Sequence, residues 1–259
     1  VWVNVSSVSS VYDTVLYMYY GNPSVGSMQD VSGTWSSGFD MVQHLNEDWS
    51  TVAGHFVDST GNGFDGTLSD GNGNSLSDVG VVGNGFRFEG DGDVIDVGAI
   101  NHGQPVSYSC WLKADNIASS GSALGRYWNS YFLGIWNWGA GVVRQNAYVN
   151  YNFVYHTESG LSDVWYLVGV TFDGSVVRYY VDGDLVGSES IAGEFYGTQW
   201  PWHIGDNGNG NFFFDGVIDE VRIADSVFSS EWIGAYYDNV MFPSLFYRVG
   251  VEETQGGVP

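Results

Sequence analysis

Basic residues are scarce in this sequence: seven Lys and Arg residues stand against 30 Asp and Glu residues, which gives a formal charge of −23. Lys113 is the single lysine. Nucleic acids and anionic lipid surfaces are bound through clustered cations. The composition therefore excludes nucleic acid as an expected partner. An acidic surface fits either simple solvation or the binding of divalent cations.

Cysteine and long apolar runs are scarce as well. Cys110 is the sole cysteine, so the chain has no internal disulfide. It lies in an alternating apolar run over residues 106–112, which predicts a small buried side chain. No apolar run approaches the roughly 20 residues that cross a bilayer, so direct membrane insertion is not expected. The chain begins at Val1 with no signal peptide, and we interpret it as a piece of a longer protein with neighbouring domains.

Aromatic residues and glycine are abundant, at 17% of the chain and 37 residues respectively. This composition favours strands and turns over helices. Asp173-Gly174 and Asp182-Gly183 separate apolar runs and predict tight hairpin turns, since Asp-Gly tolerates positive φ. One helix is expected, over residues 229–237, capped by Ser229 or Ser230. Many short strands with almost no helix predict an all-β, two-sheet antiparallel sandwich with one short C-terminal helix.

Three regions are expected along the chain. Residues 1–30 form an N-terminal strand segment that includes the β-rich run TVLYMYY at 14–20, and a Ser/Gly-rich connector covers 24–38. Residues 31–240 form the sandwich domain, and residues 241–259 form a C-terminal tail.

An ordered set of motifs resembles the laminin-G-like, concanavalin-A-like jelly-roll family. The segments are MVQHLNE (41–47), DSTGNGFDGT (58–67), GFRFEGDGDVIDV (85–97), VSYSCWL (106–112), WYLVGVTFDG with YYVDG (165–174, 179–183) and GVIDEVRI (216–223). The resemblance implies a jelly-roll topology. YMYYGNP (17–23) also resembles the end of a domain of unknown function that precedes such jelly rolls in microbial surface proteins. That likeness implies an extracellular or cell-surface location, with residues 1–30 as a remnant of the upstream domain.

The resemblance also implies a structural calcium ion. It indicates Asp58 and Asp219 as side-chain ligands, with Asn62 and Asp65 as second choices. Ca²⁺ takes six to eight oxygen ligands, which Gly/Asp/Asn turns supply. The alternative is that Asp58 and Asn62 hydrogen-bond the backbone of their own turn, as such residues often do.

Carbohydrate binding uses aromatic faces that stack on sugars, with amides and carboxylates that hydrogen-bond hydroxyl groups. In YFLGIWNW (131–138), period two places Trp136 and Trp138 on one face and Tyr131, Leu133 and Ile135 on the core face. Two clusters are candidates for sugar contact, and the alternative for each residue is a place in the core. The candidates are Trp128, Trp136, Trp138, Trp200 and Trp202.

Catalysis has weaker support. Glu89-Gly90-Asp91 lacks the second glutamate of a retaining glycosidase strand, and Asp219-Glu220 would point to opposite faces. A lyase set of Tyr148, Tyr151, His156 and Arg144 is present without fixed geometry. We therefore expect no catalytic residues.

The sequence predicts a calcium-stabilised, carbohydrate-binding or adhesive module of a secreted or cell-surface microbial protein, with a polysaccharide or glycan as partner. A glycoside hydrolase or polysaccharide lyase on the same scaffold is the first alternative. A structural spacer or subunit of a surface assembly is the second.

Overall fold

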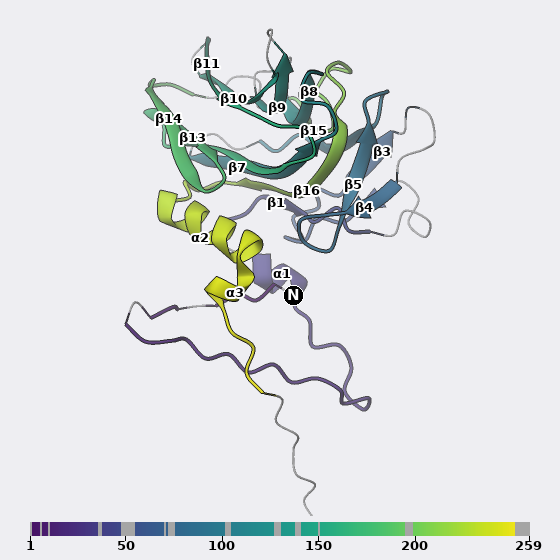
Figure 1. Cartoon of the computed structure of the whole chain (residues 1–259), viewed down its shortest axis with the longest axis vertical. Helices are drawn as coiled ribbons and strands as arrows, with labels where there is room; N and C mark the ends of the chain where they lie inside the picture. The colour runs from purple at the N-terminus through teal and green to yellow at the C-terminus, as the bar shows by residue number, and fades with distance from the viewer. Residues whose placement is uncertain are drawn as a thin grey trace, which may run out of the picture.

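Two antiparallel β-sheets pack face to face in the computed structural model of the protein (Figure 1). The structure describes residues 2–5, 7–9, 11–35, 38–47, 55–69, 71, 76–101, 105–126, 131–137, 141–149, 151–194 and 199–251. The expected all-β jelly-roll sandwich is confirmed.

The first sheet, sheet A, has the strand order β14-β13-β12-β7-β16-β5-β4, and β1 pairs with β16. First and last strands of the sandwich therefore lie side by side. The strands are β1 (Met41–Gln43), β4 (Leu76–Val79), β5 (Asn84–Glu89), β7 (Val106–Ala114), β12 (Trp165–Phe172), β13 (Val176–Val181), β14 (Asp184–Ser190) and β16 (Asp215–Ala224).

The second sheet, sheet B, has the order β11-β10-β9-β8-β15-β6-β3-β2. Its strands are β2 (His55–Phe56), β3 (Gly66–Ser69), β6 (Val94–Gly98), β8 (Gly121–Arg126), β9 (Tyr131–Asn137), β10 (Gly141–Val149), β11 (Asn152–Ser159) and β15 (Trp202–Ile204). In the described part of the chain, three helices accompany the sheets: α1 (Val31–Trp35), α2 (Ser230–Met241) and α3 (Pro243–Phe246).

The core between the sheets follows the period-two pattern of the strands. In β7, Tyr108, Cys110 and Leu112 belong to the main apolar cluster, while Trp111 faces the other way. The prediction that Cys110 is a small buried residue is confirmed, because its side chain has no exposed surface. Burial raises the pKa of this thiol well above its usual range.

Both predicted Asp-Gly hairpins are present. Asp182 and Gly183 join β13 directly to β14 with φ values of 51° and 87°. Gly174 joins β12 to β13 with a φ of 94°. These left-handed conformations are the reason that glycine occupies the second position of each turn.

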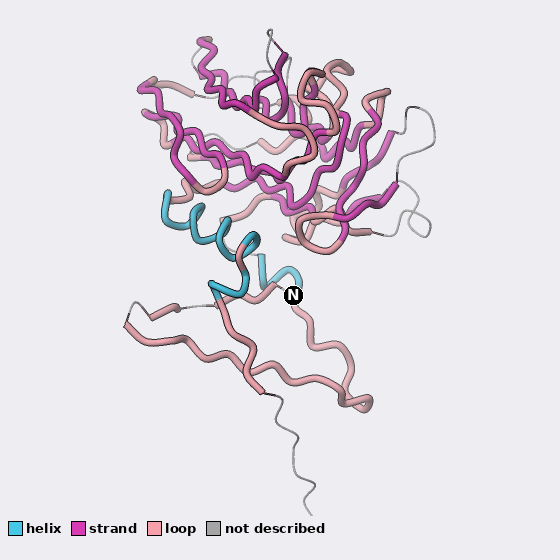
Figure 2. The backbone as a smooth tube through the Cα atoms, viewed as in Figure 1, coloured by secondary structure: helices cyan, strands magenta, loops and turns pink. Residues whose placement is uncertain are grey.

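Helix α2 covers the outer face of sheet A. It begins after Ser229, whose side chain accepts a hydrogen bond from the backbone N–H of Trp232, as the sequence predicted. The Trp111 ring stacks on Tyr237 at 5.6 Å between ring centroids, and its Nε1–H donates to the Tyr236 hydroxyl at 2.8 Å. Figures 1 and 2 show this helix lying along one side of the two sheets. Sheet A is thus buried on both faces where α2 crosses it.

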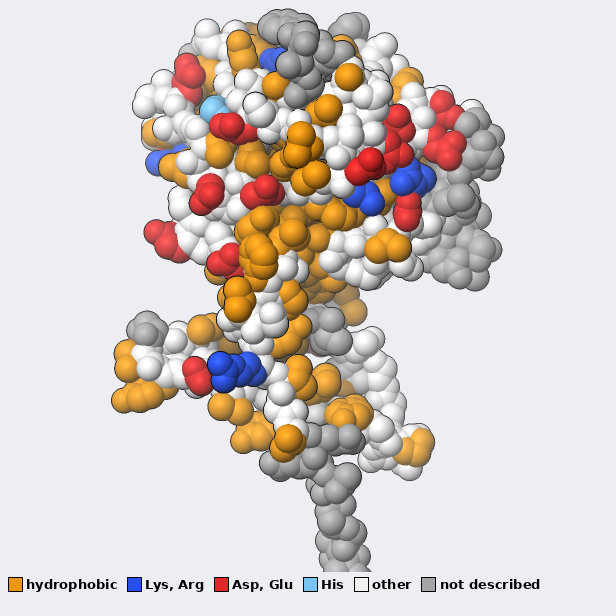
Figure 3. Space-filling model, viewed as in Figure 1, with side chains coloured by type: hydrophobic (Ala, Val, Ile, Leu, Met, Phe, Trp, Pro, Cys, Tyr) orange, Lys and Arg blue, Asp and Glu red, His pale blue; other side chains and the backbone are white. Residues whose placement is uncertain are grey.

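The N-terminal segment lies outside the sandwich, below α2 in Figure 1. Residues 14–20 carry no strand, contrary to the expected strand over this run, and large apolar side chains there are exposed, such as Tyr19 at 87% (Figure 3). The expected connector over 24–38 contains the short helix α1. The proposed domain boundaries stay predictions. Among the described residues, the helices are too short or too polar to span a bilayer.

Tyr236→Phe should lower the free energy of unfolding by about 1–3 kcal/mol, because the buried indole N–H of Trp111 loses its acceptor. Urea denaturation of the full chain measures this change. Tyr237→Phe is the matched control, since it keeps the ring that stacks on Trp111 and contacts Phe242, and should change stability by less than about 0.5 kcal/mol. Equal effects of the two variants would contradict the role assigned to the hydrogen bond.

Candidate functional site

The outer face of sheet B is the sheet surface that α2 leaves open to solvent. The helices lie on the side of sheet A (Figure 1). In β10, Val143 and Ala147 point into the core, so Arg144 and Tyr148 point outward. In β11, Val154 points inward and its neighbours Phe153 and Tyr155 point outward.

The aromatic rings of this face that reach solvent on β10 and β11 are Tyr148, Phe153 and Tyr155, which we call the aromatic strip. Tyr148 is paired with Phe153 across the two strands, and their ring centroids are 6.2 Å apart. The Phe153 and Tyr155 centroids are 6.4 Å apart, and the two side chains are 41% and 50% exposed. The sequence interpretation considered tryptophans and missed Phe153 and Tyr155. The alternation of aromatic and inward-facing residues in NFVYHTES was the signal that would have found them.

Arg144 lies beside the aromatic strip with its guanidinium held between rings. Its Cζ is 4.4 Å from the ring centroid of Trp136 and 4.4 Å from that of Tyr155. Phe153 lies at 5.6 Å. These are cation–π distances. Burial lowers the pKa of Arg144, which is 5% exposed, because desolvation disfavours its charged form.

Trp136 supports this arrangement from β9. Phe212 stacks on its ring at 5.0 Å between centroids, and the guanidinium of Arg144 also lies over the ring. The predicted alternation of β9 is confirmed, because Leu133 and Ile135 lie in the core. Trp136 is therefore placed on the outer face, where it positions Arg144.

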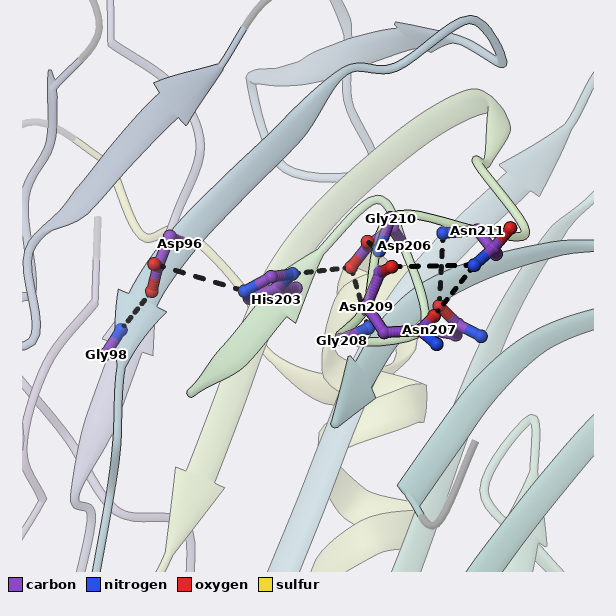
Figure 4. A network of polar contacts seen from close by, with 9 residues as sticks. All are labelled: Asp96, Gly98, His203, Asp206, Asn207, Gly208, Asn209, Gly210 and Asn211. Atoms are coloured by element: carbon purple, nitrogen blue, oxygen red, sulfur yellow. Dashed lines mark hydrogen bonds and ion pairs between the residues drawn. The ribbon is translucent and has the colours of Figure 1, made fainter. Parts of the chain in front are cut away.

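The polar loop that precedes Phe212 contains Asp206 to Asn211, whose hydrogen bonds are shown in Figure 4. Asp206 is fully buried at the start of the loop and accepts hydrogen bonds from the backbone N–H groups of Gly208 and Gly210 and from Nδ1 of His203. A Cβ on Gly125 of β8 would collide with the backbone of the same loop, so the close approach requires glycine there. The loop is thus fastened against sheet B.

His203 stands between two carboxylates in this network. Its Nδ1 is 2.7 Å from Asp206 Oδ1, and its Nε2 is 4.0 Å from Asp96 Oδ2. Burial disfavours the charged ring, but the hydrogen bond to Asp206 and the charges of both carboxylates outweigh burial and raise the pKa of His203.

The tryptophans that were predicted to contact a sugar differ in their exposure to solvent. Trp200 precedes β15 and is 45% exposed, as a ligand contact requires. Trp202 is 1% exposed and packs on Tyr108 and Tyr131 in the core. This corrects the prediction for Trp202, because a ring enclosed between the sheets has no face for a sugar. Trp128 and Trp138 lie outside the described residues.

Both carboxylate oxygens of Asp58 accept hydrogen bonds from neighbouring residues, most of them in its own turn. Its Oδ1 accepts from the N–H groups of Val42 and Thr60, and its Oδ2 accepts from the Thr60 hydroxyl and the Phe64 N–H. Asp65 is adjacent, since its Oδ1 accepts from the backbone N–H of Asp58. Asn62 donates its side-chain amide to the carbonyls of residues 39 and 40. The structure therefore joins Asp58, Asn62 and Asp65 in one hydrogen-bonded turn.

Asp219 has different neighbours. Its Oδ2 accepts from the Val82 N–H at 2.9 Å, and its buried Oδ1 has no hydrogen-bond partner. Burial, with a contribution from the charge of Glu220, raises the pKa of Asp219 to about 8. Among the described residues, no group of three or more His, Cys, Asp or Glu side chains could hold a metal ion. The donor sets at Asp58 and Asp219 do not fit a calcium site as they stand, and calcium stays a prediction.

The four residues considered as a lyase set do not lie together in the structure. Arg144 and Tyr148 face outward on β10, and Tyr151 lies in the turn before β11. His156 points to the other side of β11, where its ring stacks on Tyr179 of sheet A. The geometry does not bring these groups to one point.

Comparison with known proteins gives two family matches. A family model described as the concanavalin A-like lectin/glucanases superfamily matches residues 89–234. A model of a domain of unknown function, DUF2341, matches residues 1–52. Among curated protein sequences, none matches this chain.

Several solved structures share the fold. Domain 4 of AbnA, an extracellular GH43 arabinanase from Geobacillus stearothermophilus, solved with arabinotriose, has a TM-score of 0.59 at 18% identity over 76% of this chain and 97% of that domain. The binding domain of Paraclostridial Mosquitocidal Protein 1 has a TM-score of 0.59 at 13% identity over 79% of this chain and 53% of that one. The ligand-binding domain of botulinum neurotoxin serotype D, solved with N-acetylneuraminic acid, has a TM-score of 0.54 at 16% identity over 81% and 53%.

His203→Gln should remove a pH-dependent part of the stability. Because the folded pKa of His203 lies above its ordinary value of 6.5, the ion pair with Asp206 stabilises the fold in full below that value and is lost as the pH rises through the raised pKa. The difference in unfolding free energy between wild type and variant should therefore shrink from about pH 6 to pH 8. Chemical denaturation across this range measures it, and a difference that grows with pH would contradict the assignment.

The calcium prediction requires that added calcium raise the melting temperature above its value in EDTA, since a ligand bound only to the folded chain stabilises it. Asp58→Asn and Asp219→Asn should then reduce this increment, whereas Asp184→Asn, an exposed residue of β14, should leave it unchanged. Equal melting temperatures of the wild type in calcium and in EDTA would refute the prediction.

Proposed function

Because the chain belongs to the concanavalin A-like lectin/glucanase superfamily, we propose that it is a glycan-binding module whose ligand lies on the outer face of sheet B. In this proposal the module is part of a secreted or cell-surface protein, and the aromatic strip is the main contact surface. The structures similar in fold that were solved with arabinotriose and with N-acetylneuraminic acid support a sugar ligand. The arabinanase is an extracellular protein, which supports the location.

The exposed aromatic strip is the observation that carries the proposal. Single exposed apolar side chains are ordinary, but contiguous apolar patches mark interaction sites. Phe153 and Tyr155 stand side by side on a paired strand, so the position of their rings is fixed before a ligand arrives. Aromatic faces of this kind stack on the C–H surfaces of sugar rings.

Polar groups flank the strip. Tyr155 is paired with Asn146 on β10, and Arg144 is paired with the exposed Thr157 on β11. The exposed hydroxyl of Thr157 can hydrogen-bond a sugar hydroxyl group next to the rings, whereas Asn146 and Arg144 are buried at 1% and 5% exposure. A binding role is favoured over hydrolysis or elimination, because the described carboxylates and His156 do not converge on this face.

Tyr155→Ala and Phe153→Ala should each weaken glycan binding by about two- to tenfold, because one stacking ring is removed. Isothermal titration calorimetry with the best ligand of a glycan array measures the loss. Tyr19→Ala is the matched control, since it removes an exposed ring outside the sandwich, and should bind like the wild type. If both strip variants retained full affinity while Trp200→Ala lost it, the binding surface would lie at Trp200 instead.

A further inference from the structure

Strand β11 forms one end of sheet B among the strands that the structure describes. The N–H and C=O groups along a terminal strand can pair with another chain, so such edges are commonly short, bulged or charged. β11 is eight residues long, and its pairing with β10 runs without a bulge from Asn152 to Ser159. Every second residue of β11 therefore directs its backbone N–H and C=O groups away from β10.

The other three ends of the two described sheets differ from β11. Strands β2 and β4 contain only two and four residues. Strand β14 carries the exposed acids Asp184 and Glu189, and its pairing with β13 is interrupted by a bulge. Of the four sheet ends in the described part of the chain, β11 is thus the long one that no bulge interrupts.

His156 and Glu158 form a polar pair on this edge strand. They lie two residues apart, so both side chains point to the same face, opposite to that of the aromatic strip. Nε2 of His156 lies 2.8 Å from Oε1 of Glu158, and the two side chains are 25% and 43% exposed. Both polar groups therefore reach solvent beside the open edge.

This spacing makes the edge complementary to itself. Residues opposite each other in an antiparallel pair have their side chains on the same face and in contact. If two β11 strands pair about a twofold axis at Thr157, His156 of each copy lies opposite Glu158 of the other, so the contact is made twice. An axis at His156 would set the two His156 rings against each other. An axis at Tyr155 would set His156 against the buried Val154.

We propose that two copies of this chain associate by antiparallel pairing of their β11 strands about a twofold axis at Thr157. The occupant of the edge is a second copy, because the charge pattern of β11 complements itself in this register. The pairing closes both β11 edges and joins two eight-stranded sheets into one. The aromatic strips of both copies then lie on the same face of the joined sheet. The inference does not depend on the proposed function.

Sedimentation equilibrium of the full wild-type chain measures the association. The chain has a mass of 28.3 kDa, and we expect the average mass to rise toward twice this value as the concentration increases. The paired region covers residues 155–159 of each copy, and so short an interface should give a Kd of about 10–100 µM. A mass of 28.3 kDa at concentrations up to about 1 mM would overturn the inference.

Cysteine cross-linking locates the interface. Cys110 has no exposed surface, so an introduced thiol is the reactive one. Thr157→Cys places two thiols at the axis and should give a disulfide-linked dimer under mild oxidation, whereas Ser188→Cys on β14 should stay monomeric. Tyr19→Cys tests the exposed apolar N-terminal segment as the contact instead. Faster cross-linking of Tyr19→Cys than of Thr157→Cys would replace the proposed interface.

Glu158→Lys should weaken the dimer by about tenfold, because each His156 then faces a lysine of the other copy. Glu189→Lys is the matched control, since it makes the same change in net charge at an exposed position of β14, and should keep the wild-type Kd. Equal Kd values for the two variants would contradict the His156–Glu158 contact. The mass and cross-linking measurements need neither variant, so a folding defect of Glu158→Lys would not decide the outcome.

Discussion

The packing of α2 against Trp111 decides which outer face of the sandwich stays open to solvent. Trp111 points away from the core between the sheets and would otherwise expose a large ring on sheet A. Ile233 and Tyr236 of the helix enclose it together with Leu167 and Tyr180. The two-sheet fold thereby becomes a three-layer arrangement over part of its area. Because part of one outer face is covered by its own chain, the exposed rings of sheet B are left as an aromatic surface in contact with solvent.

The same side of sheet A also contacts both ends of the N-terminal segment, through Trp2 and Trp35. Arg222 is buried with Glu220, and its Cζ lies 4.9 Å from the ring centroids of both Trp2 and Trp35. Glu220 also lies 2.8 Å from His44, so the buried carboxylate has two cationic or hydrogen-bonding neighbours, which lower its pKa despite burial. A buried ion pair of this kind adds little net stability over apolar packing, but it is costly to break, because one charge would be left unpaired. Two tryptophans on one guanidinium therefore anchor the segment 2–35 at both of its ends.

Local chemistry explains which features were predictable from sequence. The Asp182-Gly183 turn and the Ser229 cap depend on neighbouring residues, and both are present as expected. Trp200 and Trp202 could not be told apart by their local sequence, although one is exposed and the other is buried. Period two would place them on one face, but β15 begins at Trp202, so the alternation does not extend back to Trp200.

The candidate site was less predictable because it is assembled by tertiary contacts. The ring of Phe212 stacks on Trp136 because hydrogen bonds to Asp206 hold the loop before Phe212 in place. Nothing in the local sequence of either segment indicates that contact. The turn at Asp58 shows the converse problem. The sequence allowed either a calcium ligand or a hydrogen-bonded turn, and the choice depends on where Val42 and Phe64 place their N–H groups. The position of Val42 is set by the pairing of β1 with β16, far along the chain.

The net charge of −23 and the local chemistry of a surface act over different distances. At physiological ionic strength the Debye length is about 8 Å, so the exposed carboxylates are largely screened from groups that lie farther away. Buried charges, such as that of Arg144 at 5% exposure, are screened much less. Net charge therefore governs solubility and the rate at which a charged partner approaches, whereas contacts at a surface depend on the residues that form it.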